Sequence, residues 1–159
     1  MSQVLFYPLF LCIALILTLV YIPRPQYKKY LIYAAATGGL GEMIIAIILN
    51  TLFNMGHYTR IGIFNIFGYN YLSPFVWTFL QMLFLYFLPV RRGFLSAYIL
   101  GFVGISIGFG YMIENLGIFV FNPTFYRWIS PIIYLTWWSG TAWFFRRTEG
   151  INRRTEKVP

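Results

Sequence analysis

Five runs of apolar residues, separated by short polar stretches, dominate the pattern of the chain. A helix needs roughly 20 apolar residues to cross a bilayer, and the first four runs are about that long. None of the runs alternates apolar and polar residues over about ten positions, as a membrane β-strand would. The pattern predicts an all-α protein with one transmembrane domain, residues 1–147, and a basic cytoplasmic tail, residues 148–159. We expect five transmembrane helices, at about 4–22, 30–53, 74–90, 94–114 and 131–146.

Composition agrees with a membrane protein. Hydrophobic residues make up 59% of the chain and charged residues only 10%, which is too little polar surface to cover a water-soluble domain. The first run follows uncharged residues and precedes Arg24, Lys28 and Lys29, the opposite polarity to a cleaved secretory signal, so we expect it to remain as the first helix. The single cysteine, Cys12, excludes an intramolecular disulfide framework.

The net charge of +8 is distributed unevenly along the chain. Placing the N-terminus outside and the C-terminus in the cytoplasm puts most cations on the cytoplasmic side: Arg24, Lys28, Lys29, Arg91, Arg92, Arg146, Arg147, Arg153, Arg154 and Lys157. Only Arg60 and Arg127 are then external, which satisfies the positive-inside rule. The charge therefore predicts attraction to anionic lipids at the cytoplasmic face rather than to nucleic acid, each cation contributing about 1 kcal/mol. A regulatory role for the tail is the alternative to a purely topogenic one.

The two predicted external segments resemble each other: GIFNIFGYNYLSP begins at Gly62 and GIFVFNPTFYRWISP at Gly117. The similarity predicts a repeat of two helical hairpins, and coincidence in an aromatic-rich chain is the alternative. Each segment ends in Ser-Pro, a signal for a helix start in which the serine caps a free amide. A helix over residues 131–145 would be about 22 Å long, shorter than the hydrocarbon core of about 30 Å. We therefore expect the aromatic segments to lie in the outer leaflet and cover an external cavity.

Glu42 is the one carboxylate in the predicted second helix, with no lysine or arginine nearby. An ionisable group in the membrane costs at least about 2.5 kcal/mol and by default marks a functional site. Glu42 belongs to a row of mostly small residues at a spacing of four, which predicts contact with another helix: Ala34, Gly38, Ala46 and Asn50. Gly104 and Gly108 form a similar pair in the fourth helix.

Counting inward from the outer helix ends places several polar residues about 12 to 16 Å deep, in one layer: Glu42, Gln81, Ser106 and Ser139. With Asn50, these are the candidates for a polar cavity. One interpretation is structural, in which a protonated Glu42 donates a hydrogen bond to Gln81 or to a carbonyl and ties helices together. The other is functional, in which Glu42 anchors a cation or the polar head of an amphiphile. A proton relay is a third interpretation.

Glu114 and Asn115 are expected at the outer rim, where Glu114 would pair with Arg60 or Arg127 and clamp an external loop, or bind a ligand directly. No metal or other cofactor is expected, because the chain has no HxxE or CxxC spacing. The chain has no aspartate, and no serine or cysteine at the depth of its single histidine, so nothing indicates nucleophilic catalysis.

Three segments carry a resemblance: YIPRPQYKKY from Tyr21, WTFLQMLFLYFLPVRR from Trp77 and WWSGTAWFFRR from Trp137. They resemble a group of small multi-pass membrane proteins of spore-forming Firmicutes that have no assigned function, which implies a bacterial cell membrane. The length and five helices are also similar to the tryptophan-rich sensory proteins that bind porphyrins, but the Trp-x-Pro-Pro loop of those proteins is absent here.

These observations predict a non-enzymatic membrane protein that binds a hydrophobic or amphiphilic small molecule, or a partner helix, in an outer-leaflet cavity. One alternative is a protomer of a proton- or cation-coupled transporter or channel, working as a homo-oligomer. The other is a scaffold or assembly subunit that holds a membrane partner.

Overall fold

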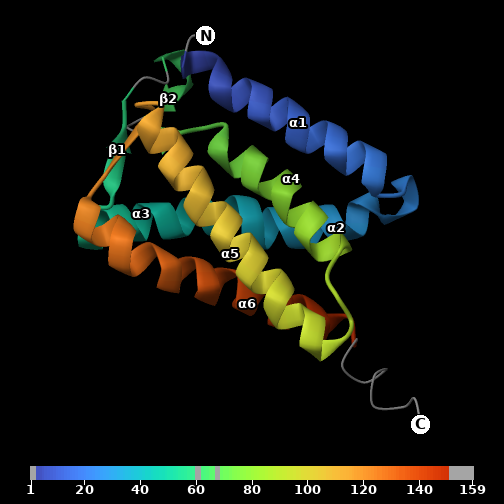
Figure 1. The fold of residues 1–159 in the computed structure, drawn as a ribbon. Coiled ribbons are helices and arrows are strands. Elements are labelled where there is room, and N and C mark those ends of the chain that lie inside the picture. The colour runs from blue at the N-terminus through green and yellow to red at the C-terminus, as the bar shows by residue number, and fades with distance from the viewer. Residues whose placement is uncertain (1–2, 60–61, 67–68, 151–159) are drawn as a thin grey trace.

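The computed structural model describes residues 3–59, 62–66 and 69–150, which form a bundle of helices with short strands at one end (Figure 1). The first half of the chain contains η1 (Gln3–Leu5), α1 (Phe6–Tyr21), η2 (Arg24–Gln26), α2 (Tyr27–Ala34), η3 (Ala35–Leu40), α3 (Gly41–Phe53), β1 (Gly56–Tyr58), η4 (Gly62–Phe64), β2 (Asn65–Ile66) and β3 (Tyr69–Asn70). The second half contains α4 (Ser73–Tyr86), α5 (Arg92–Asn115), β4 (Phe119–Phe121), η5 (Phe125–Ile129) and α6 (Ser130–Thr148). The η segments are short 3-10 or π helices.

Within the described residues, three helical segments are long and apolar enough to cross a membrane: Gln3–Tyr21, Arg24–Phe53 and Gly93–Asn115. The apolar helix Ser73–Tyr86 is shorter, and α6, which carries two arginines in its last turn, is not among the candidates. Large apolar side chains cover much of the outer surface; Val20, for example, is 71% exposed. A protein in water rarely exposes so much apolar surface, so the structure is compatible with a membrane-embedded protein.

The short helix α4 lies at the centre of the bundle. It packs against α1, α2 and η3, and half of its residues are buried. Its side chain Phe84 is fully buried and meets Trp138 of α6, with 4.5 Å between the ring centroids. The sequence predicted this helix over residues 74–90, but it ends earlier, at Tyr86. The physical reason is Pro89, because the residue before a proline avoids helical geometry.

Close approach of η3 to α4 explains two of the small residues in this region. A Cβ added at Gly38 would lie 2.7 Å from the Trp77 carbonyl oxygen, and one added at Gly39 would overlap the Thr78 hydroxyl. Glycine is therefore what allows these backbones to touch. The pair Gly104 and Gly108 behaves differently, because both are exposed and nothing in the described chain lies within 4 Å of an added Cβ.

Contacts made by α6 and the residue after it join elements at the end of the bundle where α6 finishes. Arg146 is buried and donates hydrogen bonds to the carbonyl oxygens of Pro89 and Val90, at 3.2 and 3.1 Å. Lys29 of α2 forms an ion pair with Glu149, just beyond α6. These contacts explain why α6 continues past residue 146, where the sequence pattern predicted its end.

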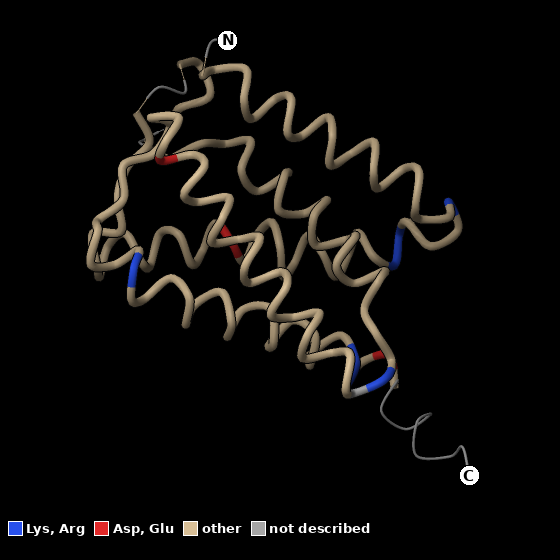
Figure 2. The backbone as a smooth tube through the Cα atoms, viewed as in Figure 1, with Lys and Arg blue, Asp and Glu red and all other residues tan. Residues whose placement is uncertain are grey.

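The positive charges of the described chain are segregated by position (Figure 2). One end of the bundle, where α1 and α6 finish and α5 begins, carries most of the described cations: Arg24, Lys28, Lys29, Arg91, Arg146 and Arg147. Arg127 lies at the opposite end, in η5 before α6 begins.

The structure is mostly helical, as expected, and adds two small sheets of two- and three-residue strands. Strand β1 pairs antiparallel with β4, and β2 pairs with β3. Backbone groups near a membrane need internal partners, and strand pairing supplies them to the loops between helices. Gly56 has φ of 147°, and a Cβ there would overlap the Val120 carbonyl oxygen, so this register requires glycine. We call residues 55–59 and 116–122, which contain β1 and β4, the cap.

Candidate functional site

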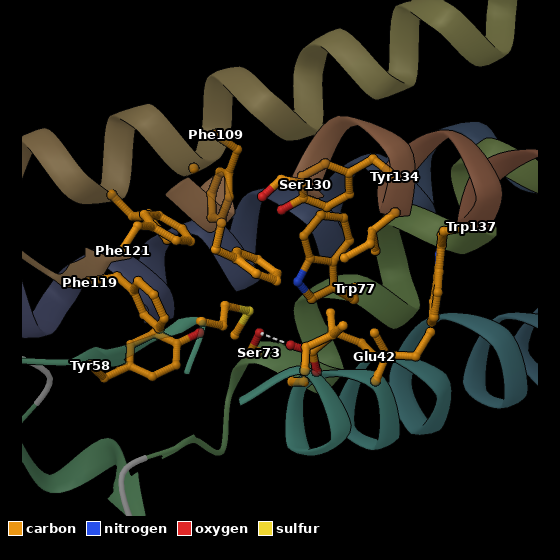
Figure 3. Close-up of a pocket in the computed structure, with 18 of the residues that line it drawn as sticks. Glu42, Tyr58, Ser73, Trp77, Phe109, Phe119, Phe121, Ser130, Tyr134 and Trp137 are labelled. Atoms are coloured by element: carbon orange, nitrogen blue, oxygen red, sulfur yellow. Dashed lines mark hydrogen bonds between the residues drawn. The ribbon is translucent and has the colours of Figure 1, made fainter. Parts of the chain in front are cut away.

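A cavity of about 120 Å³ lies between the cap and the helix ends beneath it. On this measure a water molecule needs about 10–15 Å³, so the cavity accommodates a small molecule or the head of a larger one. Half of the residues that line it are aromatic, and Figure 3 labels several of them: Trp77, Phe109, Phe119, Phe121, Tyr134 and Trp137. Its polar wall includes Glu42, Ser73, Tyr7 and Tyr58.

Glu42 is placed by the first turn of α3, directly after the π-helical turn η3. Its Oε1 accepts a hydrogen bond of 3.0 Å from the hydroxyl of Ser73, at the start of α4 (Figure 3). The close approach of η3 to α4 brings these two side chains together. Within the described residues the ion pair is Lys29–Glu149, so no described cation neutralises Glu42. The carboxyl group thus faces the interior of the bundle and borders an aromatic cavity.

Two tyrosines extend the polar wall towards the cap. The hydroxyls of Tyr7 in α1 and Tyr58 in β1 lie 3.2 Å apart. Burial raises the pKa of Tyr58 to about 12, so its phenol stays protonated at neutral pH and remains able to donate a hydrogen bond. Tyr58 also neighbours Ser73, so hydroxyl groups from the cap, α1 and α4 converge near the Glu42 carboxyl group.

Four other predicted cavity residues lie elsewhere. Gln81 of α4 is fully buried against η3, and within the described residues neither its amide oxygen nor its nitrogen has a hydrogen-bond partner. Ser106 accepts a hydrogen bond of 3.0 Å from the Trp138 indole and donates one to a backbone carbonyl. Ser139 and Asn50 do not line the cavity either, and the buried Oδ1 of Asn50 has no hydrogen-bond partner in the part of the chain that the structure describes. The predicted polar layer is therefore not a shared site: of its members, only Glu42 reaches the cavity.

The predicted ion-pair clamp is not seen in the described part of the chain. Glu114 and Asn115 end α5, and Arg127 is exposed in η5 without an ion pair to Glu114. Arg60 lies outside the described residues.

The loops are instead joined by the backbone pairing of the cap and by side-chain bonds to its carbonyl groups. Thr59 donates to the Gly117 oxygen and Gln3 to the Leu116 oxygen, both at 2.6 Å. Hydrogen bonds to backbone groups thus join the loops where an ion pair was expected, because each loop carries several peptide groups that need hydrogen-bond partners.

Sequence reasoning missed Ser73 as the partner of Glu42. It interpreted Ser73 as a helix cap, but the hydroxyl makes no capping bond and is directed to the carboxyl group. Tyr7 and Tyr58 were also missed, since nothing in their spacing indicates that the first helix meets the first external loop. The available signal was depth, because both lie close to predicted outer helix ends.

A second hollow of about 520 Å³ lies between α3 and α6. Its lining contains no charged residue and includes Ile48, Ile132 and Gly140. We call it the α3–α6 groove. It shares four lining residues with the cavity: Ile45, Leu49, Ile133 and Trp137. The cavity and the groove are therefore separated by little more than these side chains.

Comparison of the chain with protein-family models, with curated proteins and with solved structures finds no match. The function is therefore inferred from the geometry of the cavity.

Proposed function

We propose that this chain is a multi-pass membrane protein that binds a hydrophobic or amphiphilic small molecule in the cavity beneath the cap. The observation that carries the proposal is the hydrogen-bonded Glu42 at the edge of a cavity with aromatic walls. Binding sites for small molecules are typically apolar hollows with a few placed polar groups. A volume of about 120 Å³ favours a small molecule over a partner helix, whose diameter is about 10 Å.

The same proposal includes an orientation. Five helices would cross the bilayer, with the basic end cytoplasmic and the cap external, in a bacterial plasma membrane. The clustering of described lysines and arginines away from the cap supports this arrangement. The cavity would then lie in the outer leaflet. The short α4 would be accommodated because the aromatic cap is itself at interfacial depth.

Contact quenching of tryptophan tests the binding proposal. Trp77, Trp137 and Trp138 line the cavity, whereas Trp128 and Trp143 are exposed on the outside. Replacing the two exposed tryptophans with phenylalanine removes most of the quenching by probe dissolved in lipid. In nanodiscs of zwitterionic lipid, 8-bromo-1-octanol should then quench the remaining fluorescence with a saturable component.

A cavity-filling variant gives the control for this experiment. Ala46 lines the cavity, so Ala46→Phe should remove the saturable component. Gly104 is exposed on α5 with open space around it, so Gly104→Phe should leave it unchanged. Quenching that never saturates, or that is the same in both variants, would show that the cavity holds no ligand and would end the proposal.

Cation- or proton-coupled transport is a second candidate, favoured by one observation. Gln81 lies on the same face of α4 as Ser73, about 12 Å deeper, and its buried amide has no hydrogen-bond partner among the described residues. It would provide the next polar step below Glu42. Flux of protons or of a cationic dye into proteoliposomes tests this; transport that Glu42→Gln abolishes would favour a carrier over a binding protein.

A further inference from the structure

The charge of the cavity restricts what it can hold. Glu42 is the one carboxylate among the lining residues, and no lysine or arginine lines the cavity. Indole and phenol rings attract cations to their faces within about 6 Å of the ring centre, and Trp77, Trp137 and Tyr58 all border this space. Calcium or magnesium would require six or more oxygen ligands, which a wall of this kind does not supply. The wall therefore favours an organic cation.

The neighbouring groove supplies a place for an alkyl chain. Trp137 lines both hollows, and its ring packs against the α3 backbone at Gly41, where an added Cβ would lie 2.7 Å from the ring. On the outer side of the groove, Ile132 is 65% exposed and Ile48 is 47% exposed, so this side faces the surroundings of the bundle. An alkyl chain lying there would remain in an apolar environment along its whole length.

We propose that the ligand is a single-chain amphiphile with a cationic head, such as an alkyltrimethylammonium. The head lies in the cavity beside Glu42, and the chain passes Trp137 into the α3–α6 groove. This inference rests on the proposed function and adds the charge of the head and the path of the chain. Because the groove opens on the side of the bundle, such a ligand enters from the outer leaflet without passing through the cap.

Three decyl probes with different heads test the charge of the ligand. Decyltrimethylammonium, 1-decanol and decyl sulfate are titrated against the protein in nanodiscs of zwitterionic lipid, which avoids a surface potential that would concentrate one of them. Competition with the saturable quenching by 8-bromo-1-octanol is the readout. We expect the ammonium probe to bind at least tenfold more tightly than the alcohol, and decyl sulfate to bind more weakly than both. Glu42→Gln should abolish the preference for the cation.

A groove-filling variant tests the path of the chain. Gly140 lines the groove, and an added Cβ there meets nothing within 4 Å, so Gly140→Phe should fold and fill the groove. It should weaken decyltrimethylammonium at least tenfold, whereas the matched variant Gly104→Phe should change its affinity less than twofold. An unchanged affinity in Gly140→Phe would overturn the path.

The outcomes separate this inference from the proposed function. Saturable 8-bromo-1-octanol binding with equal affinities for all three heads would overturn the cationic ligand and leave the binding function intact. Absence of saturable binding by every probe would remove both.

Discussion

The contact between η3 and α4 can be tested with one methyl group. Gly39→Ala places a Cβ 3.1 Å from the Pro74 carbonyl oxygen and into the hydroxyl of Thr78. Neither neighbour can move easily, because one is backbone and the other is a short side chain that is itself hydrogen-bonded to Pro74 at 2.7 Å. Overpacking of this kind costs about 1–3 kcal/mol.

Gly104→Ala is the matched control for this substitution. Gly104 lies inside α5 with open space in front of it, so the added methyl group meets nothing. Replacing glycine by alanine in a helix gains about 0.5–1 kcal/mol from backbone propensity alone. Since that gain is roughly common to both sites, the two variants should differ in stability by about 1–3 kcal/mol, with Gly39→Ala the less stable.

Unfolding in mixed micelles with increasing dodecyl sulfate, followed by tryptophan fluorescence, measures this difference. Gly39→Ala should also weaken 8-bromo-1-octanol binding in nanodiscs, because separating η3 from α4 moves Glu42 away from Ser73. Equal stability of the two variants would refute the close approach. A large loss in Gly104→Ala would also refute the reasoning, since it would mean that the exposed face of α5 is packed.

Three further substitutions address buried polar groups and can be followed by the same unfolding titration. Gln81→Met should stabilise the protein by about 1–3 kcal/mol, because it removes a buried amide that has no hydrogen-bond partner in residues 3–59, 62–66 and 69–150; a loss of stability would show that the amide is bonded. Trp138→Phe should cost about 1–3 kcal/mol, because it removes the bond to Ser106 and leaves a void; a neutral result would contradict the observed packing. Tyr58→Phe should make stability less sensitive to alkaline pH. The pKa of Tyr58 is raised from 10.0 to about 12 on folding, so its contribution is complete below about pH 10 and is lost as the pH rises towards 12. An unaltered alkaline profile would contradict this.

Much of the fold follows from patterns along the chain. The long apolar segments and the Ser-Pro helix start at Ser73 are predicted by local physical rules, and α4 begins at that serine. At Ser130 the prediction is only partly right, because the π-helical turn η5 runs directly into α6 there. The pairing of β1 with β4 was not predictable in this way. It joins Gly56 to Phe121 across two intervening helices, and no periodicity within either segment specifies its partner.

The candidate site shows the same division. Glu42 was identified because a carboxylate in an apolar run is costly wherever it lies. Its partner was predicted to be Gln81 or a backbone carbonyl, whereas the structure pairs it with Ser73, since counting residues gives depth along a helix but not rotation about it. The π-helical turn at Ala35–Leu40 changes that rotation just before Glu42, and no feature of the sequence indicated a π turn there. Depth alone was therefore not enough to predict which polar residues on the helices meet.

The central position of α4 has a consequence for biogenesis. Fourteen helical residues span about 21 Å, so α4 alone is shorter than the hydrocarbon core of a bilayer, which is about 30 Å thick. It nevertheless leaves the ribosome before α5 and α6, which cover it. During synthesis α4 must therefore pack against α1 and α2, or remain in contact with the insertion machinery, until α5 and α6 have been made. Truncation after residue 91 would therefore leave this segment unprotected and expose the nascent chain to quality-control proteolysis.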